Sequence, residues 1–492
     1  MNTCRCVDVW YVAHTSRWRN QTPKFRVMQF KIVGDPSPEA WSRVRRYAAW
    51  MRQVHLGDQS AIVGDTLYKL RQGLPSGGWF PALQDLSLSI TESNLPYTDL
   101  FFSPHLKKIS IYMLWSRRRP EVPRDTLAAA ASTISALPTS ALQSLSVDVG
   151  CSARPACFKD SLSSVVLRCG SSLTEFTSTV PLSDAATNHL IRLPRLRTWH
   201  IEGPPPRHST SSLSLIFPPL TELTLGEGAA RGWLSLWERP EDGASTMQDV
   251  SPTSRVKDSL KSLNIKDLSI LIINTSLTSQ IRTFRNLVHL WIRGYCPDED
   301  EEGQCIFGLN NDDVTNLAVA LPQLESLSLG VPCPKNTCAT TVACLLQISV
   351  HCVKLEELEI HFNSTSIVGD LKNISMDPQF QELRSLPKCP LSCLYVNGIP
   401  LALGEPGLET VVDGMIVIFP SLTQCTGLEW CWNEVSERIR ELRKLEILIA
   451  DMRDCVAQVI FPLCLIFFRT AGETRKISQT YSYVHRSESQ SN

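Results

Sequence analysis

The sequence predicts an α/β solenoid, a curved stack of repeats with parallel strands on its concave face and helices or irregular returns outside. The first observation behind this prediction is a recurring phrase, L-x-x-L-x-L, which is LTELTL from Leu220 and LESLSL from Leu324. Such phrases mark leucine-rich repeats, in which each unit supplies one strand and one return and can bury its apolar edge only against a neighbour. Looser copies of the phrase begin at Leu83, Leu106, Leu142, Leu173, Leu196, Leu260, Leu287, Leu355, Leu391 and Leu445.

The spacing of the copies is the second observation. Successive copies begin 23 residues apart at the closest, from Leu83 to Leu106, and insertions lengthen other intervals. The asparagine that follows the leucine phrase in regular repeats occurs here only as Asn264 and Asn397. A proline precedes many copies, which suits a chain that leaves a helix and enters a strand. This pattern is typical of degenerate leucine-rich repeats with a long period.

Four segments are expected along the chain. They are an irregular head, a helical cap, the solenoid, and an apolar segment followed by a disordered polar tail, at residues 1–35, 36–79, 80–452 and 453–492. In the cap, apolar residues recur at steps of three and four, which predicts an amphipathic helix near 38–55 that begins at Ser37 or Pro38. This helix is expected to cover the open end of the first repeat, because the outer face of a terminal repeat would otherwise be wet and apolar.

Helical returns are expected between several strands. In one of them, Asn311 or Asp312 can cap the helix while Val314 and Leu317 face the strands. The returns expected to be helical are 125–137, 310–321, 340–352 and 433–445, and insertions are expected at 228–256 and 295–308.

The composition limits the classes of partner and the cellular location that we expect. The 492 residues include 48 basic and 49 acidic ones, so no overall field attracts the chain to nucleic acid or to a membrane, and neither is expected as a partner. The 17 cysteines are scattered and no apolar signal segment opens the chain, which predicts a reduced, cytoplasmic or nuclear location. The longest apolar stretch, 456–468, contains Gln458 and Pro462 and falls short of the ~20 residues that a membrane-spanning helix needs.

No motif for catalysis or cofactor binding occurs in the sequence. Phosphate-binding glycine loops, the nucleophile elbow G-x-S-x-G and the zinc motif H-E-x-x-H are missing, so we expect neither an enzyme nor a bound cofactor. Four cysteines and a histidine gather in one region, but their spacing does not match zinc sites and several fall at apolar helix positions. Buried structural thiols are therefore favoured over a metal site. These residues are Cys333, Cys338, Cys344, His351 and Cys352.

The alternation of side chains along a strand identifies a candidate binding surface. The leucines of the phrase point into the solenoid, so the residues between them line the concave face. There Trp291 stands where neighbouring repeats have Ser or Thr, with Arg293 one step along, and both residue types are enriched at binding hot spots. Two alternatives remain open. The insertion 295–308 could cover Trp291. Glu357, Glu359 and His361 could bind a basic segment of a partner, or they could simply be a solvated charged strand. The expected protein-binding residues are Lys266, His289, Trp291, Arg293, Glu357, Glu359, His361 and Tyr395.

Several loose motifs follow one another in a recognisable order. DPSPEAWSRVRRYAAWMRQVHL begins at Asp35, GWFPALQDLSL at Gly78 and YTDLFFSPHLKKISI at Tyr97. Late in the chain, CPLSCLYVNGIPL begins at Cys389 and WNEVSERI at Trp432, with IFPSL between them. In this order of motifs the chain resembles the large family of basidiomycete F-box proteins with leucine-rich repeats.

The resemblance implies a function. Members of that family are thought to be substrate receptors of cullin-type ubiquitin ligases, in which an N-terminal F-box binds a small adaptor and the repeats hold the target. The resemblance thus predicts a non-catalytic protein-protein recognition scaffold with its target on the concave face. The leucine-proline-x-glutamate opening and three apolar helices of an F-box are not evident in residues 1–35, so the ligase adaptor is a partner only if a diverged F-box exists. The alternatives are a stand-alone scaffold without a ligase link, an enzyme whose site is not visible in the sequence, and a nucleic-acid-associated repeat protein.

Overall fold

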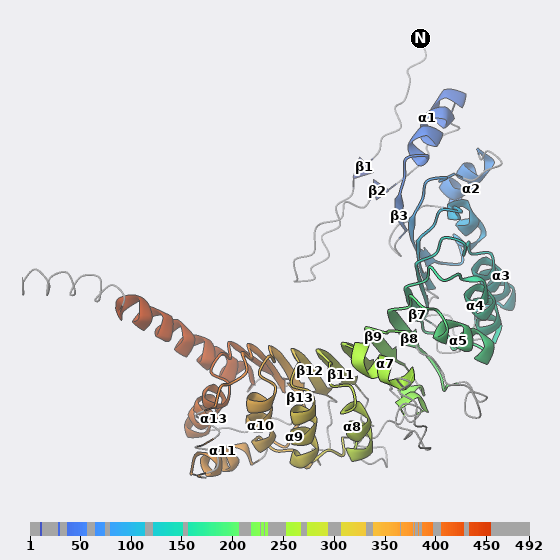
Figure 1. Cartoon of the computed structure of the whole chain (residues 1–492). Coiled ribbons are helices and arrows are strands. Elements are labelled where there is room, and N and C mark those ends of the chain that lie inside the picture. The colour runs from blue at the N-terminus through green and yellow to red at the C-terminus, as the bar shows by residue number, and fades with distance from the viewer. Residues whose placement is uncertain are drawn as a thin grey trace, which may run out of the picture.

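The structure is a computed structural model, in which the strands stack side by side along an arc and the helices cover its outer side (Figure 1). It describes residues 10–11, 28–29, 37–56, 64–73, 79–113, 122–150, 156–205, 218–226, 228–230, 232–234, 252–266, 273–293, 307–330, 338–364, 366–376, 378, 382, 386–396, 405–427 and 432–453. Most of the two expected insertions and all of the expected polar tail lie outside these residues.

One parallel sheet of 13 strands forms the inner layer of the arc, and its spatial order follows the sequence from β3 to β15. This sheet confirms the predicted α/β solenoid, because an open parallel sheet of this kind requires a return between every two strands. The strands are β3 (Gln53–Leu56), β4 (Asp85–Ile90), β5 (Lys108–Met113), β6 (Ser144–Val149), β7 (Glu175–Ser178), β8 (Thr198–Ile201), β9 (Glu222–Leu225), β10 (Ser262–Ile265), β11 (His289–Arg293), β12 (Ser326–Gly330), β13 (Glu357–Ile360), β14 (Cys393–Val396) and β15 (Gln424–Gly427).

Helices supply most of the returns and lie on the outer side of the sheet, except the first and the last, which lie at its two ends (Figure 1). They are α1 (Pro38–Ala48), α2 (Gly64–Gln72), the 3₁₀ helix η1 (Leu95–Phe101), α3 (Arg124–Ser135), α4 (Ala156–Arg168), α5 (Asp184–Ile191), α7 (Pro252–Ser259), α8 (Thr275–Ile281), α9 (Asn311–Ala320), α10 (Ala343–His351), α11 (Ile367–Met376) and α13 (Glu405–Ile418), followed by a helix over 432–453. In the head, expected to be irregular, β1 (Trp10–Tyr11) and β2 (Met28–Gln29) form a separate antiparallel pair.

The register of the strands explains the leucine phrase. Leu263 of β10 pairs with Leu290 of β11, which pairs with Leu327 of β12, and the row continues through Leu358 of β13. All four side chains are buried, so each leucine packs against the equivalent leucine of the next repeat. Burial of such a row removes apolar surface from water at every repeat and holds the stack together.

The N-terminal end of the sheet begins earlier than the sequence predicts. The helix expected near 38–55 ends at Ala48, and Gln53–Leu56 instead forms β3 beside β4. The physical reason is the alternation of QVHL, which buries Val54 and places its polar neighbours outward. The start of α1 is as expected, since Ser37 is the N-cap and accepts a hydrogen bond from the backbone N–H of Ala40.

The C-terminal end differs from the prediction in a similar way. The phrase LEILIA at Leu445 was expected to form a strand, but it lies within the helix over 432–453, and the last strand that the structure describes is β15. The prediction was wrong because this phrase continues a run of strong helix formers with apolar residues three and four apart. Ion pairs at i and i+3, from Arg438 to Glu441 and from Arg443 to Glu446, support the helix.

The returns at 125–137, 310–321, 340–352 and 433–445 are helical as expected. The cap of α9 is Asn310 rather than Asn311 or Asp312. The Asn310 side chain accepts from the backbone N–H of Asp313 at 2.9 Å, and Asp313 accepts from the backbone N–H of Asn310 at 3.2 Å. The side-chain oxygen of Asn311 instead bonds to the next repeat, where it accepts from the backbone N–H of Thr341 at 2.8 Å.

Among the helices that the structure describes, none combines the length and apolarity needed to cross a lipid bilayer.

Candidate binding surface on the concave face

The polar residues of the strands form a row parallel to the leucine row. Asn264 pairs with Trp291, Trp291 with Ser328, Ser328 with Glu359, and Glu359 with Tyr395. Because neighbouring strands are ~4.8 Å apart, this row extends across five repeats without interruption. The register therefore places Trp291, Glu359 and Tyr395, which come from three separate repeats, in one row.

Trp291 and His289 lie on the same face of β11 and stack on each other. Their ring centroids are 5.3 Å apart and their planes differ by 5°. Both side chains are partly buried, and on the adjacent strand they face the small residues Ser326 and Ser328. Stacking fixes the orientation of the indole before any partner arrives, which reduces the entropy lost on binding. The alternative interpretation places the insertion 295–308 over Trp291, and all of this insertion before residue 307 lies outside the described part of the chain.

Arg293 reaches across β12 to the acidic strand β13. Its guanidinium lies 3.6 Å from the carboxylate of Glu359, and the hydroxyl of Ser328 donates a hydrogen bond of 2.6 Å to the same carboxylate. Gly330 is the residue paired with Arg293 on β12, so no side chain stands between the two charges on that strand. The ion pair is partly exposed and contributes little to stability, but it positions one positive and one negative group beside the aromatic pair.

Tyr395 and Glu357 complete the C-terminal side of this surface, and Lys266 lies exposed directly after β10 on its other side. Partial burial of Tyr395, with Cys393, Glu357 and Glu359 nearby, raises the pKa of its phenol. The phenol therefore stays protonated at neutral pH and can donate a hydrogen bond. We name the group formed by Lys266, His289, Trp291, Arg293, Glu357, Glu359 and Tyr395 the concave patch.

His361 does not belong to the concave patch, so its assignment to the binding face was wrong. The side chain is fully buried and meets the ring of Phe307 edge to face, with centroids 5.5 Å apart. Burial lowers the pKa of His361 to about 4. Alternation predicts an outward side chain here, but β13 ends at Ile360, and Phe307 from the long return after β11 packs over the following position.

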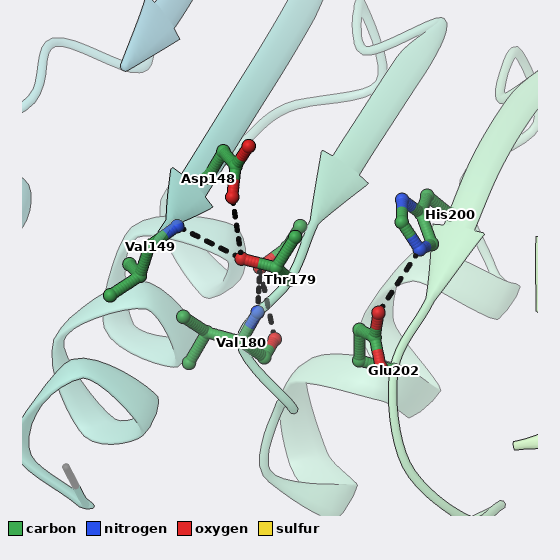
Figure 2. A network of polar contacts seen from close by, with 7 residues as sticks. Asp148, Val149, Thr179, Val180, His200 and Glu202 are labelled. Atoms are coloured by element: carbon green, nitrogen blue, oxygen red, sulfur yellow. Dashed lines mark hydrogen bonds and ion pairs between the residues drawn. The ribbon is translucent and has the colours of Figure 1, made fainter. Parts of the chain in front are cut away.

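A second polar cluster occupies the N-terminal half of the concave face (Figure 2). The Thr179 hydroxyl accepts from the backbone N–H of Val149 at 2.9 Å and donates to the carboxylate of Asp148 at 3.2 Å. One repeat further, the Nε2 atom of His200 lies 3.2 Å from the carboxylate of Glu202, and both side chains are largely buried. Alternation along β8 predicts that His200 and Glu202 share a face, whereas the approach of Thr179 to Asp148 depends on the turn after β7 and has no sequence signal.

Gly226, which follows β9, leaves the space that the carboxylate of Glu202 occupies. A Cβ atom at position 226 would lie 2.1 Å from the Glu202 carboxylate, so a larger residue would displace the acid from His200. The position of Glu202 therefore depends on close packing between the residues that follow β8 and β9. This second polar cluster lacks an aromatic anchor, which makes the concave patch the better candidate for binding.

The cysteine-rich region is part of the core. Cys338, Cys344 and Cys352 are buried and free, and Cys389 joins them, while Cys333 lies outside the described residues. Burial raises the pKa of Cys352 to about 12 and that of Cys389 to about 11, so these thiols stay protonated and pack as small apolar groups. Within the described ranges no three His, Cys, Asp or Glu side chains converge as metal ligands would.

No model of a known protein family matches the chain, and no curated protein is significantly similar to it. The fold and the concave patch are therefore the features from which a function can be argued.

Proposed function

We propose that the protein is a non-catalytic recognition scaffold that binds a protein target on its concave patch, with Trp291 as the central anchor. The observation that carries this proposal is the stacked pair of Trp291 and His289, set among small serines on the inner surface of a curved sheet. Such a surface presents a large amphipathic ring at low entropic cost to a convex partner.

The surroundings of Trp291 support this role. Binding energy concentrates where an aromatic or arginine side chain is enclosed by weaker contacts that exclude water. Here the indole has Ser328 on one side, Asn264 on the other and Arg293 two residues along its own strand. A partner seated over the ring would cover these polar groups and leave Lys266 and Glu357 at the rim.

The charges of the concave patch suit a target of mixed charge. Lys266 and Arg293 supply positive charge, and Glu357 and Glu359 supply negative charge on neighbouring repeats. With no single sign dominant, the surface selects a partner by the arrangement of its charges rather than by overall field. This favours a folded or extended protein segment over nucleic acid, whose phosphates require a positive surface.

The resemblance to F-box proteins extends the proposal to a substrate receptor of a ubiquitin ligase. In that case the ligase adaptor and a cullin would accompany the protein when it is purified from cells. A stand-alone scaffold would carry its target without them. The two versions share the concave patch and differ only in the adaptor.

Photo-crosslinking tests the proposal directly. A benzophenone amino acid would replace either Tyr395, which is exposed in the concave patch, or Val319, which is exposed on the outer helix α9. We expect irradiation of cells that produce the full chain to crosslink a protein at position 395 and not at position 319. Equal crosslinking at both positions, or crosslinking at 319 alone, would contradict the assignment of the concave face.

A further inference from the structure

The helix over 432–453 covers the C-terminal end of the solenoid with its first half only. Trp432, Val435 and Ile439 are fully buried, and the Trp432 ring meets Phe362 edge to face at 6.3 Å. The Ser436 hydroxyl accepts a hydrogen bond from the backbone N–H of Cys425 in the last strand, β15. This half is therefore a terminal cap, which protects the open end of a repeat stack.

The second half of the same helix projects beyond the sheet (Figure 1, red). Its sequence continues the apolar stripe. The stripe runs from Val435 and Ile439 through Leu442 and continues at steps of three and four. Four of its large side chains are 44% to 58% exposed, namely Leu445, Leu448, Ile449 and Met452. An apolar stripe on an exposed helix favours a partner surface, because isolated apolar residues do not repeat with this period.

We propose that this stripe, which we call the terminal stripe (Leu445, Leu448, Ile449 and Met452), pairs with the terminal stripe of a second copy of the protein. The two helices lie antiparallel in this dimer. The proposal is independent of the concave patch, because the terminal stripe lies in the C-terminal helix and contains no residue of the patch.

The charges beside the terminal stripe select a second copy and an antiparallel orientation. Glu446, whose carboxylate also pairs with Arg443 of its own helix, and Arg453 are seven residues apart and therefore lie on one side of the helix, flanking the stripe. In an antiparallel pair centred near Ile449, Glu446 of each copy faces Arg453 of the other, so one pair of residues gives two attractive contacts. In a parallel pair, like charges would face each other and oppose association.

The size of the terminal stripe predicts a reversible dimer. Two exposed stripes of about two helical turns each bury less than the ~1,000 Å² in total that specific, stable interfaces require, which fits a weak interface. The dimer should therefore dissociate on dilution. The other possible occupants of this face are the apolar segment 456–468 of the same chain and an unrelated protein. Either of them would leave the purified chain monomeric in the following experiment.

Sedimentation velocity of the purified full chain over a concentration series measures the association. We expect a shift from one to two chains per particle as concentration rises. Leu448→Glu should abolish the shift, whereas Met376→Glu, which alters an exposed apolar residue on α11 outside the stripe, should leave it unchanged. A wild-type protein that stays monomeric throughout, or a dimer that survives Leu448→Glu, would overturn the proposal in favour of another occupant or another interface.

Charge exchange tests the antiparallel arrangement. Glu446→Arg and Arg453→Glu should each weaken self-association about tenfold or more, because each variant places like charges opposite each other. An equimolar mixture of the two variants should dimerise like the wild type, since every facing pair then has opposite charges. A mixture that associates no better than either variant alone would exclude this geometry.

Discussion

Replacing Leu290 with Ala should lower the free energy of unfolding by about 2 to 5 kcal/mol, the range for a buried leucine that leaves a cavity. Leu290 is fully buried in β11, between Leu263 and Leu327 of the neighbouring strands. In a stack of repeats, stability is the sum of nearest-neighbour contacts, so a cavity at this position weakens two interfaces at once. Urea denaturation followed by circular dichroism measures the loss.

Trp291→Ala is the matched control for this change, because it alters the next residue on the same strand. Its side chain faces outward from the leucine row, so we expect a stability change of about 1 kcal/mol or less. If Trp291→Ala destabilises the protein as much as Leu290→Ala, the ring is part of the core and the concave patch loses its anchor.

The stability of the protein should fall between pH 6.5 and about 4 because of His361, whose pKa is lowered from 6.5 to about 4 by burial. Above pH 6.5 the imidazole is neutral in both states and contributes no pH dependence. As the pH falls below 6.5, His361 becomes protonated in the unfolded chain but stays neutral in the folded chain. This difference in proton binding favours unfolding. The loss from this residue reaches about 3 kcal/mol near pH 4.

A comparison with His361→Gln isolates this contribution, because every other titrating group is common to both proteins. We expect the free energy of unfolding of the wild type to fall more steeply than that of the variant over this pH range, so that the two curves converge as the pH drops. Parallel curves would mean that His361 is solvated and titrates near its ordinary value.

The sequence allowed the middle of the fold to be predicted and not its ends. Each internal leucine phrase formed a strand, since its apolar positions have no other way to be buried. At Leu445 the same phrase lies in a helix, because neighbouring residues with strong helix propensity outweigh a pattern of six residues. Strand β15, with the sequence QCTG, has no leucine phrase and is held by pairing with β14.

The candidate site shows the same limit. Alternation placed Trp291, Arg293 and Glu359 on one face, because a strand leaves no other choice. The contact between Arg293 and Glu359 depends on Gly330 lying between them, which requires the register of three strands. His361 was misplaced because the residue that buries it, Phe307, is separated from it by more than one repeat.

The affinity of the protein that crosslinks at position 395 for the Trp291→Ala variant is the most direct test of the concave patch. We expect loss of the indole to weaken binding by about 2 kcal/mol or more, a factor of about 30 in the dissociation constant. Trp50→Ala is the matched control, because this tryptophan is 68% exposed at the N-terminal end and lies outside the patch. Weak binding by Trp291→Ala with unchanged binding by Trp50→Ala is the predicted result, and undiminished binding by Trp291→Ala would contradict it.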